Sequence, residues 1–304
     1  MNKRTIVGYG LGQYYESLRV RGLFKGKIEF DYYCDRKWED SQIEMYDGIP
    51  IISMEEIKKL ENPLVVILIK NNWSADAVIC EFEKHGIECK RIHEIIPLEY
   101  TITGIELKEK YGNGYYHDEM NNTIHFDMTV PDKLYVIFGG MNNQISIGRN
   151  VVTASLVIRF GNEGVCRIGD NSDLVGTEIY VSYGNVEVGE NCLLSNQIII
   201  RNHDGHHIFD KDSGKRINNC TNIKIGNHVW IGQRAMLLGG ASMGTGSVVG
   251  AGSIVTKSFG DHVVVAGVPA KIIRENICWS SENTDYFNRD CFGECVDQIA
   301  REFF

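Results

Sequence analysis

The sequence predicts a two-part chain, in which a small α/β domain precedes a parallel β-helix. The β-helix is predicted from a strict repeat, because an aliphatic residue or Met recurs at every sixth position from residue 225 to residue 255. Gly follows four of these six residues, and a small or β-branched residue stands four positions after each of the first five. The α/β domain is predicted from short apolar strands that alternate with helical segments over the first 97 residues.

A period of six matches neither an amphipathic helix nor a simple alternating strand. It is typical of a parallel β-helix, in which each unit of six forms one short strand and one corner. The aliphatic residues then fill the interior of a triangular prism, and the small residues fit beside its corners. The two sets are Ile225, Ile231, Leu237, Met243, Val249 and Val255, and Val229, Ala235, Ala241, Ser247 and Ser253.

Weaker units of the same kind precede the strict repeat. They occur at Ile147-Gly148, Ile168-Gly169 and Val188-Gly189, and their unequal spacing predicts extra residues that bulge from the corners. The register is lost after Ile200 and returns at Ile225. We therefore expect a β-helix over residues 141–274, with residues 201–222 leaving the prism as an extended loop.

The first 97 residues read as a parallel, Rossmann-like α/β domain. The apolar segments "RTIVGYG", "KIEFDYYC", "PLVVILIK" and "IECKRI" are candidate strands, and Ser53 and Ser74 are candidate N-caps of the helices between them. A glycine-rich stretch follows the first strand, but Gln13 stands where a dinucleotide fingerprint has its third glycine. Asp35 lies about 20 residues on, as a ribose-binding acid does. Nucleotide or nucleotide-sugar binding and a docking role both stay open.

Two further segments show no repeat. Residues 98–140 contain several tyrosines without a clear period, and we expect a linker and an irregular first cap there. Residues 275–304 are expected to form a short helical cap, because the last coil of a β-helix exposes apolar interior and unpaired strand edges.

Composition limits the possible partners. The net charge of −9 argues against nucleic acid or an anionic membrane surface as the main partner, since both call for a basic face. No apolar run approaches the ~20 residues of a membrane span, and the first apolar stretch is too short and glycine-rich for a secretion signal. The nine scattered cysteines include no pair with zinc-like spacing. We expect a reduced, cytoplasmic protein.

The loop at residues 201–222 holds three histidines within five residues, His203, His206 and His207. Imidazole is well suited to take a proton from a hydroxyl group near neutral pH. Most surface histidines are simply solvated, but a long loop that interrupts a strict repeat is usually functional. The loop is therefore the first place to look for a catalytic base.

The motifs resemble a known family. The segment from Ile223 to Arg274 is similar to the hexapeptide-repeat acyltransferases, which have a left-handed β-helix. The segment from Arg201 to Ile217, "RNHDGHHIFDKDSGKRI", resembles the active-site loop of the bacterial sugar and capsular polysaccharide O-acetyltransferases in that family. The resemblance covers about residues 142–274, and its most specific parts are Asp204-Gly205-His206, His228-Val229-Trp230-Ile231-Gly232 and Gly267-Val268-Pro269-Ala270-Lys271.

This resemblance implies direct transfer of an acetyl group from acetyl-CoA to a sugar hydroxyl. His206 would be the general base and Asp204 would orient it, while His203 or His207 could take its place. The family binds the donor in a groove between neighbouring subunits of a homotrimer, and no metal is expected. The resemblance assigns the donor contacts to Trp230, Gln233, Ala251, Thr256, Lys257, Lys271 and Arg274. Core packing and simple solvent exposure are the alternative explanations for Trp230 and for the basic residues.

The function that we expect is O-acetylation of a glycan, in a capsular or cell-surface polysaccharide. The nearest alternative is an N-acetyltransferase for a nucleotide-linked amino sugar, since some such enzymes also join a small α/β domain to a β-helix. A nucleotide-sugar is thus a possible partner of the first domain. Zinc-dependent hydration and a non-enzymatic scaffold role are more distant alternatives, and zinc analysis and the activity of a His206→Ala variant would separate them.

Overall fold

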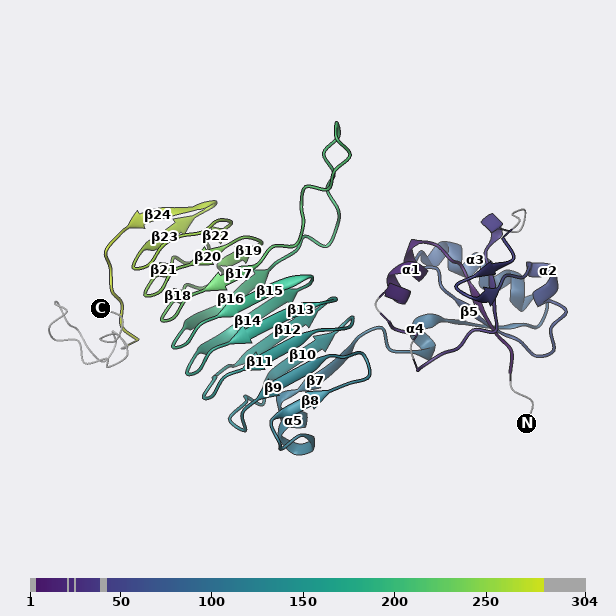
Figure 1. The fold of residues 1–304 in the computed structure, drawn as a ribbon, viewed down its shortest axis with the longest axis horizontal. Coiled ribbons are helices and arrows are strands. Elements are labelled where there is room, and N and C mark those ends of the chain that lie inside the picture. The colour runs from purple at the N-terminus through teal and green to yellow at the C-terminus, as the bar shows by residue number, and fades with distance from the viewer. Residues whose placement is uncertain (1–3, 21, 25, 39–42, 282–304) are drawn as a thin grey trace. The chain divides into compact units, whose positions relative to one another are not determined.

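The computed structural model describes residues 4–20, 22–24, 26–38 and 43–281. The chain divides into two compact units, Met1–Leu98 and Glu99–Phe304, shown with their elements in Figure 1. Each unit has a buried hydrophobic cluster of its own.

The first unit contains a four-stranded parallel sheet in the order β2-β1-β5-β6. The central strand β5 is almost completely buried, with Val65, Val66 and Ile67 at most 1% exposed, as its continuous apolar sequence predicts. From β1 the chain goes first to β2, which lies on one side of β1, and later to β5, which lies on its other side. The strand order therefore reverses between β1 and β5. The strands are β1 (Ile6–Tyr9), β2 (Tyr32–Cys34), β5 (Leu64–Ile67) and β6 (Glu88–Arg91).

The helices of this unit begin at polar caps. Ser53 and Glu56 form the predicted capping box of α2 (Met54–Ile57). The prediction of Ser74 as the next cap was wrong, because α3 (Asn72–Glu83) begins after Asn71, whose side chain accepts the Ser74 N–H at 3.2 Å. Asn is as effective a cap as Ser, and it comes three residues earlier. The remaining elements are α1 (Gln13–Val20), η1 (Arg36–Trp38), β3 (Met45–Tyr46), β4 (Ile49–Pro50) and α4 (Ile92–Ile95).

The second unit is a parallel β-helix with three faces. One sheet forms the first face, and its strands are β8 (Tyr115–His117), β9 (Thr123–Phe126), β11 (Gln144–Ile147), β13 (Gly164–Ile168), β15 (Gly184–Val188), β17 (Ile223–Ile225) and β20 (Ser242–Met243). The other sheet bends over the second and third faces. Its two long strands β14 (Asp173–Val181) and β16 (Leu193–Arg201) span both faces, and a register shift at Gly176/Thr177 marks the bend.

The shorter strands of the bent sheet belong to one face each. The second face contains β18 (Trp230–Ile231), β21 (Val248–Val249), β23 (Val264–Gly267) and β24 (Ala270–Arg274). The third face contains β7 (Tyr100–Thr103), β10 (Leu134–Phe138), β12 (Ser155–Phe160), β19 (Met236–Leu238) and β22 (Ile254–Val255). We call the corner between the second and third faces the second corner, and the corner between the third and first faces the third corner.

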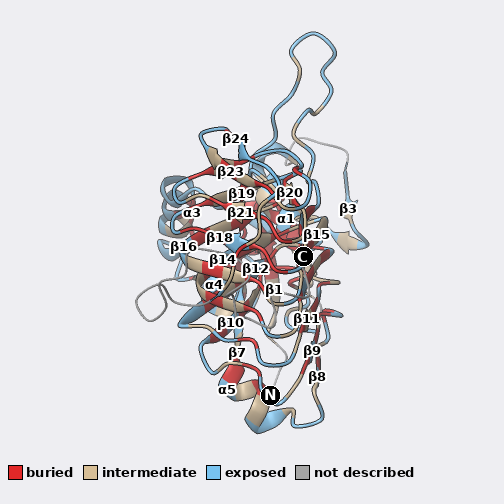
Figure 2. Cartoon of the chain, turned by 90° about the vertical axis from the view of Figure 1, so that its left-hand side faces the viewer, coloured by how far each residue is buried: buried red, intermediate tan, exposed pale blue. Residues whose placement is uncertain are grey.

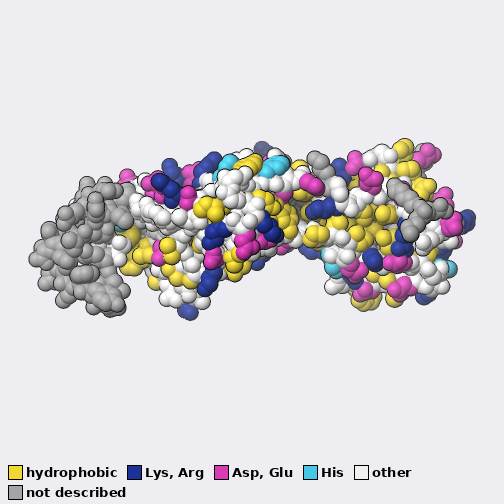
Figure 3. Space-filling view, turned by 90° about the horizontal axis from the view of Figure 1, so that it is seen from below, with side chains coloured by type: hydrophobic (Ala, Val, Ile, Leu, Met, Phe, Trp, Pro, Cys, Tyr) yellow, Lys and Arg dark blue, Asp and Glu magenta, His cyan; other side chains and the backbone are white. Residues whose placement is uncertain are grey.

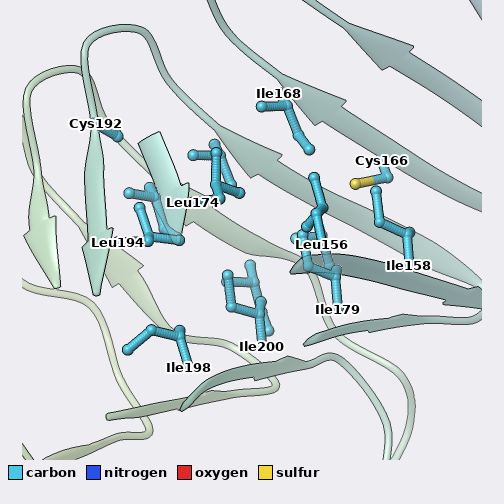
Figure 4. Close-up of a cluster of buried hydrophobic side chains, with 14 of the residues drawn as sticks. Leu156, Ile158, Cys166, Ile168, Leu174, Ile179, Cys192, Leu194, Ile198 and Ile200 are labelled. Atoms are coloured by element: carbon cyan, nitrogen blue, oxygen red, sulfur yellow. The ribbon is translucent and has the colours of Figure 1, made fainter. Parts of the chain in front are cut away.

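The predicted repeat fills the interior of this prism. All six aliphatic positions and all five small positions are at most 1% exposed, which confirms the prediction. Ile225 pairs with Met243, Ile231 with Val249 and Leu237 with Val255, so three hexapeptides make one turn. Figure 2 shows the buried residues along the inside of the coils, and Figure 4 shows the side chains of successive coils converging there.

The earlier coils are longer, as the unequal spacing predicts. Ile147 pairs with Ile168 and Ile168 with Val188, so these repeats stack despite their irregular spacing. Polar side chains bridge the stacked corners. For example, Asn143 donates to the Asn122 side-chain oxygen at 2.9 Å and accepts the Gly164 N–H at 2.8 Å. Such bonds satisfy backbone groups that the wider corners bury.

Residues 98–140 were predicted to be a linker and an irregular first cap, and the prediction of where the coils begin was wrong. Strands β9 and β10 pair in parallel with β11 and β12, so the coils begin well before residue 141. Strands β7 and β8 pair antiparallel with this first coil, and α5 (Gly104–Lys110) adds the fully buried Leu107 to the prism core. The strands carry inward-facing residues at every second position, but their connections differ in length, so no period of six is visible in the sequence.

The end of the β-helix also differs from the expectation. Strand β24 folds back antiparallel on β23, and the following residues 275–281 contain no helix. The rest of the predicted helical cap, residues 282–304, lies outside the described part of the chain. Among the helices that the structure describes, none combines the length and the apolar character needed to cross a membrane.

Candidate active site

A long excursion leaves the prism at the third corner, after β16, and returns at β17. Most of its side chains are exposed, and a bridge between Phe209 and Arg216 makes its outer part a hairpin, which projects from the coils in Figures 1 and 2. The start of the excursion is held by Asn202, which is 1% exposed and makes two 2.9 Å hydrogen bonds with the backbone of Ser182 on the previous coil. The excursion occupies the segment expected as a loop, with the first residue of that segment, Arg201, still in β16.

His206 lies in this loop with an exposed side chain. Its backbone carbonyl accepts a hydrogen bond from the Asn218 side chain at 2.7 Å, and the same amide nitrogen donates to Asp204 Oδ2 at 2.9 Å. Within the described part of the chain, no hydrogen bond joins the Asp204 carboxylate to the His206 ring. Asp204 is thus linked to the His206 turn through Asn218 and makes no direct hydrogen bond to the ring.

Asn218 is the residue of this loop that our sequence analysis did not single out. Besides the two bonds that it donates, its Oδ1 accepts from the Ile208 N–H at 2.7 Å and from Arg216 Nε at 3.4 Å. One side-chain amide therefore holds both arms of the loop together on either side of His206. A single Asn among loop residues carries no sequence signal for such a role, since its partners are up to fourteen residues away.

Replacing Asn218 should therefore misplace His206 without removing it. On the expectation from the sequence that His206 is the base of an acetyl transfer, Asn218→Asp, which keeps the size but loses both donated bonds, should lower kcat about 10- to 100-fold, because small misplacements of a catalytic group have effects of this order. The neighbouring Asn219→Ala serves as the control and should keep the native rate. Equal kcat values for native protein and Asn218→Asp, measured by release of free CoA, would show that this amide does not position the base.

The two other histidines of the loop have different surroundings. His203 is half-buried beside Arg201, and burial together with this cation lowers its pKa, so the neutral imidazole is favoured. The exposed ring of His207 meets Phe209 edge-on, with centroids 5.9 Å apart. In the sequence, His206 thus stands between His203, which is half-buried and favours the neutral form, and His207, which contacts an aromatic ring.

The residues assigned to donor binding separate into groups along the prism. Gln233 and Ala251 stack at the second corner on successive coils, where Gly252 N–H donates to the Gln233 carbonyl at 2.8 Å. Lys271 continues this column, since it pairs with Ala266 of the next coil. Arg274 follows on the same strand, β24, and all four side chains are exposed.

Thr256 and Lys257 lie at the third corner instead. The Lys257 carbonyl accepts the Ser242 N–H at 3.3 Å, and the Lys257 ammonium lies 5.4 Å from the centre of the Phe259 ring. On the preceding coil the same corner holds Gly239, which packs closely against Thr221 at the end of the excursion. These two residues are therefore on the side of the prism from which the His206 loop leaves.

Trp230 belongs to neither group. It begins β18 on the second face and is 40% exposed, beside Trp279 at a centroid distance of 6.0 Å. Trp279 stacks on the buried His228 at 4.0 Å and donates its Nε1–H to the His228 carbonyl at 2.9 Å. The segment after β24 therefore forms a support behind Trp230, and this support was not foreseen.

Comparison with known proteins agrees with this geometry. The model of the bacterial transferase hexapeptide (six repeats) family matches residues 222–257. A polysialic acid O-acetyltransferase of Neisseria meningitidis is 34% identical over 192 residues, which cover 54% of this chain and 88% of the relative. The chain belongs to the bacterial hexapeptide transferase family.

Two further similarities support this assignment of the hexapeptide transferase. A polysialic acid O-acetyltransferase of Escherichia coli O1:K1 is 40% identical over 105 residues, but the match spans only 34% of each chain. The crystal structure of the polySia-specific acetyltransferase NeuO is 37% identical, covers 54% of this chain and 76% of that chain, and superposes with a TM-score of 0.51. The left-handed β-helix of such acetyltransferases is therefore the fold of the second unit.

The buried cysteines of this hexapeptide transferase are poor nucleophiles. Burial raises the pKa of Cys166 to about 12 and that of Cys192 to about 11, so both thiols are protonated near neutral pH. Within the described residues, no three His, Cys, Asp or Glu side chains converge as metal ligands do. The histidine loop brings three imidazole groups, which are suited to proton transfer, within five residues.

The first unit contains a separate cleft of about 500 Å³, at the carboxyl ends of β1 and β5. Gly10, Gly12 and Gln13 line it, together with Asp35 and Trp73. The Asp35 carboxylate accepts the Leu11 N–H at 2.7 Å and the Lys37 N–H at 3.1 Å. These bonds close the glycine-rich turn, so Asp35 has a structural function here in addition to any contact with a ligand.

Proposed function

We propose that this hexapeptide transferase is an acetyl-CoA-dependent O-acetyltransferase that modifies a sugar hydroxyl of a capsular or cell-surface polysaccharide. The observation that carries the proposal is the match to the meningococcal enzyme, which spans 88% of that relative and 54% of this chain. The chain matches only about a third of the Escherichia coli polysialic acid enzyme. The overall activity is therefore inferred from the β-helical unit.

The exposed imidazole of His206 supports a direct mechanism. In the proposed reaction the neutral ring takes the proton of the acceptor hydroxyl while its oxygen attacks the thioester carbonyl of acetyl-CoA. The tetrahedral oxyanion collapses to the sugar ester, and the CoA sulfur leaves with the proton that His206 has taken. A backbone N–H beside the site would stabilise the oxyanion.

We propose that the donor binds between two copies of the chain, in a homotrimer. Within one chain the histidine loop leaves at the third corner, whereas Gln233, Ala251 and Lys271 follow the second corner and Trp230 begins a strand of the second face. The whole third face separates the loop from these residues. A site that uses both groups therefore takes them from neighbouring subunits, with Lys271 and Arg274 available for the CoA phosphates.

An acetylation assay tests this function. The protein is incubated with acetyl-CoA and either a hydroxylated capsular oligosaccharide or a nucleotide-linked amino sugar. The mass of each product is then measured by mass spectrometry. We expect one-acetyl mass increments on the oligosaccharide. Acetylation confined to the amino group of the nucleotide-linked sugar would favour the N-acetyltransferase alternative. Light scattering on the same sample should give the mass of three chains.

We also propose that the first unit is a Rossmann-like domain whose cleft takes a nucleotide-linked sugar. The cleft lies where the strand order reverses, which is the usual ligand position in open parallel sheets. Its lining includes the cations Arg36 and Lys70 and the indole of Trp73, which is 87% exposed and available for stacking on a base.

Calorimetry with a uridine diphosphate sugar checks this second proposal. We expect saturable binding to the native chain and binding at least about tenfold weaker to Trp73→Ala, because stacking of a base on an aromatic ring contributes about 1–3 kcal/mol. A surface variant outside the cleft, Lys84→Ala, should bind like the native chain. Identical titrations for native protein and Trp73→Ala, or no heat with either, would exclude the cleft as this site.

A further inference from the structure

Arg201 stands at the start of the histidine loop, and among the described residues no carboxylate forms an ion pair with it. It is the last residue of β16, on the third face, where it pairs with Tyr180 of β14 and Leu238 of β19. Its guanidinium carbon lies 5.0 Å from the centre of the Tyr180 ring. This cation–π contact fixes the plane and the position of the guanidinium.

In the part of the chain that the structure describes, the guanidinium of Arg201 makes no hydrogen bond or ion pair with a protein group. Its Nε is buried and makes no hydrogen bond, although the side chain as a whole is half-buried. The nearby carboxylates are engaged elsewhere, since Asp204 accepts from Asn218 at 2.9 Å and Glu178 accepts from the Tyr180 hydroxyl at 2.6 Å. A partly buried guanidinium without an anion is unfavourable on its own, and therefore points to an external anion.

The position of this cation connects it with the proposed base. Arg201 Nη2 lies 3.6 Å from where a Cβ would stand on Gly205, the residue before His206. Gly205 has φ +81°, so the turn is suited to glycine, and the missing side chain leaves the guanidinium accessible beside the loop. The same charge lowers the pKa of His203, which supports its closeness to the histidine cluster.

We propose that Arg201 selects an acidic acceptor, by binding the carboxylate of the sugar whose hydroxyl is presented to His206. This inference rests on the proposed O-acetyltransferase function and adds the substrate class and the residue that recognises it. A guanidinium forms paired hydrogen bonds with a planar carboxylate, and these are among the stronger polar contacts in proteins. A sugar acid carries its carboxylate and its hydroxyls on one ring, which suits two recognition groups that are close together.

The charge distribution favours the acceptor as the source of this anion. The chain carries a net charge of −9, and Figure 3 shows cations and carboxylates interspersed on the β-helix face in view. An acidic polymer therefore needs a local cation at the reaction site. The phosphates of the donor have other candidate partners, Lys271 and Arg274, which lie on β24 of the second face.

The test compares two acceptors that differ only in charge. Native protein, Arg201→Gln and Arg201→Lys are assayed with acetyl-CoA and either an oligosialic acid or the same oligomer with its carboxyl groups reduced. We expect native protein to prefer the acidic oligomer, and Arg201→Gln to lower kcat/KM for it about 10- to 100-fold, mainly through KM. Arg201→Lys should recover part of this loss, and KM for acetyl-CoA should stay unchanged in all variants.

A matched control lies on the same row of the third face. Arg159 pairs with Tyr180 from the other side and has Glu99 at 4.0 Å, so Arg159→Gln removes a charge without touching the loop and should keep the acceptor preference. A rise in KM for acetyl-CoA in Arg201→Gln, or an equal loss with both acceptors, would overturn the inference. Calorimetry measures binding of the acidic oligomer to native protein and to Arg201→Gln. Binding that depends on Arg201, in a protein that shows no acetyl transfer, would contradict the transferase function and leave the function of Arg201 in acceptor binding intact.

Discussion

Alanine at position 206 should lower kcat for acetyl transfer by about 10²- to 10⁴-fold, the range found when a general base is removed. His206 is the histidine in the Asp204-Gly205-His206 turn, and its side chain is exposed to an incoming acceptor. The alanine variant should still bind acetyl-CoA, since Gln233, Ala251, Lys271 and Arg274, the donor contacts proposed above, lie at the second corner and on the second face. Steady-state kinetics with acetyl-CoA and the oligosaccharide acceptor measures both quantities.

The neighbouring histidines provide matched controls for this prediction. His203→Ala and His207→Ala remove rings from the same loop, and we expect each to keep kcat within about tenfold of the native value. Melting temperatures of the three variants should agree, because none of these side chains is fully buried. A native rate for His206→Ala, combined with a large loss for His203→Ala, would assign the base to His203 instead.

A second large effect concerns stability. Leu237→Ala should lower the free energy of unfolding by about 2–5 kcal/mol, the usual range for truncating a buried leucine. Leu237 is 0% exposed and lies in the interior between Ile200 and Val255 of the adjacent coils. Since the prism interior is a continuous column, a cavity here removes contacts with the coils above and below. Denaturant titration followed by circular dichroism gives the value.

Leu238→Ala is the control for this stability prediction. Leu238 follows in the same strand, points to the outside of the prism and is only partly buried. Its truncation should change the free energy of unfolding by clearly less than that of Leu237. If the two variants unfolded at the same denaturant concentration, the inward and outward assignment of β19 would be wrong.

The sequence predicted the β-helix because its geometry imposes a period on the chain. Every sixth side chain from Ile225 to Val255 must enter the same narrow interior, so the repeat is visible without any other information. The loop was predictable for the same reason, as a gap in that period. The first coil was not, because β9 and β10 bury alternate residues between connections of unequal length, and this pattern resembles ordinary strands.

The contacts of the candidate site were less predictable than its location. The pattern placed Asp204 and His206 together, but the bond between them is indirect, since Asn218 lies between them from the far arm of the loop. The unpartnered charge of Arg201 depends on where Tyr180 and Gly205 are in space. In the first unit, likewise, spacing suggested a ribose contact for Asp35, whereas its carboxylate closes the turn at Leu11. Long-range partners of single polar residues leave no trace in the spacing of one sequence.

A crystal structure of the full chain with bound CoA tests the central claim most directly. The account predicts a trimer in which the CoA sulfur lies beside the ring of His206, in a groove that a neighbouring subunit completes with Gln233 and Ala251. A sulfur that lies far from this ring, or a single chain that binds CoA without a partner, would contradict it.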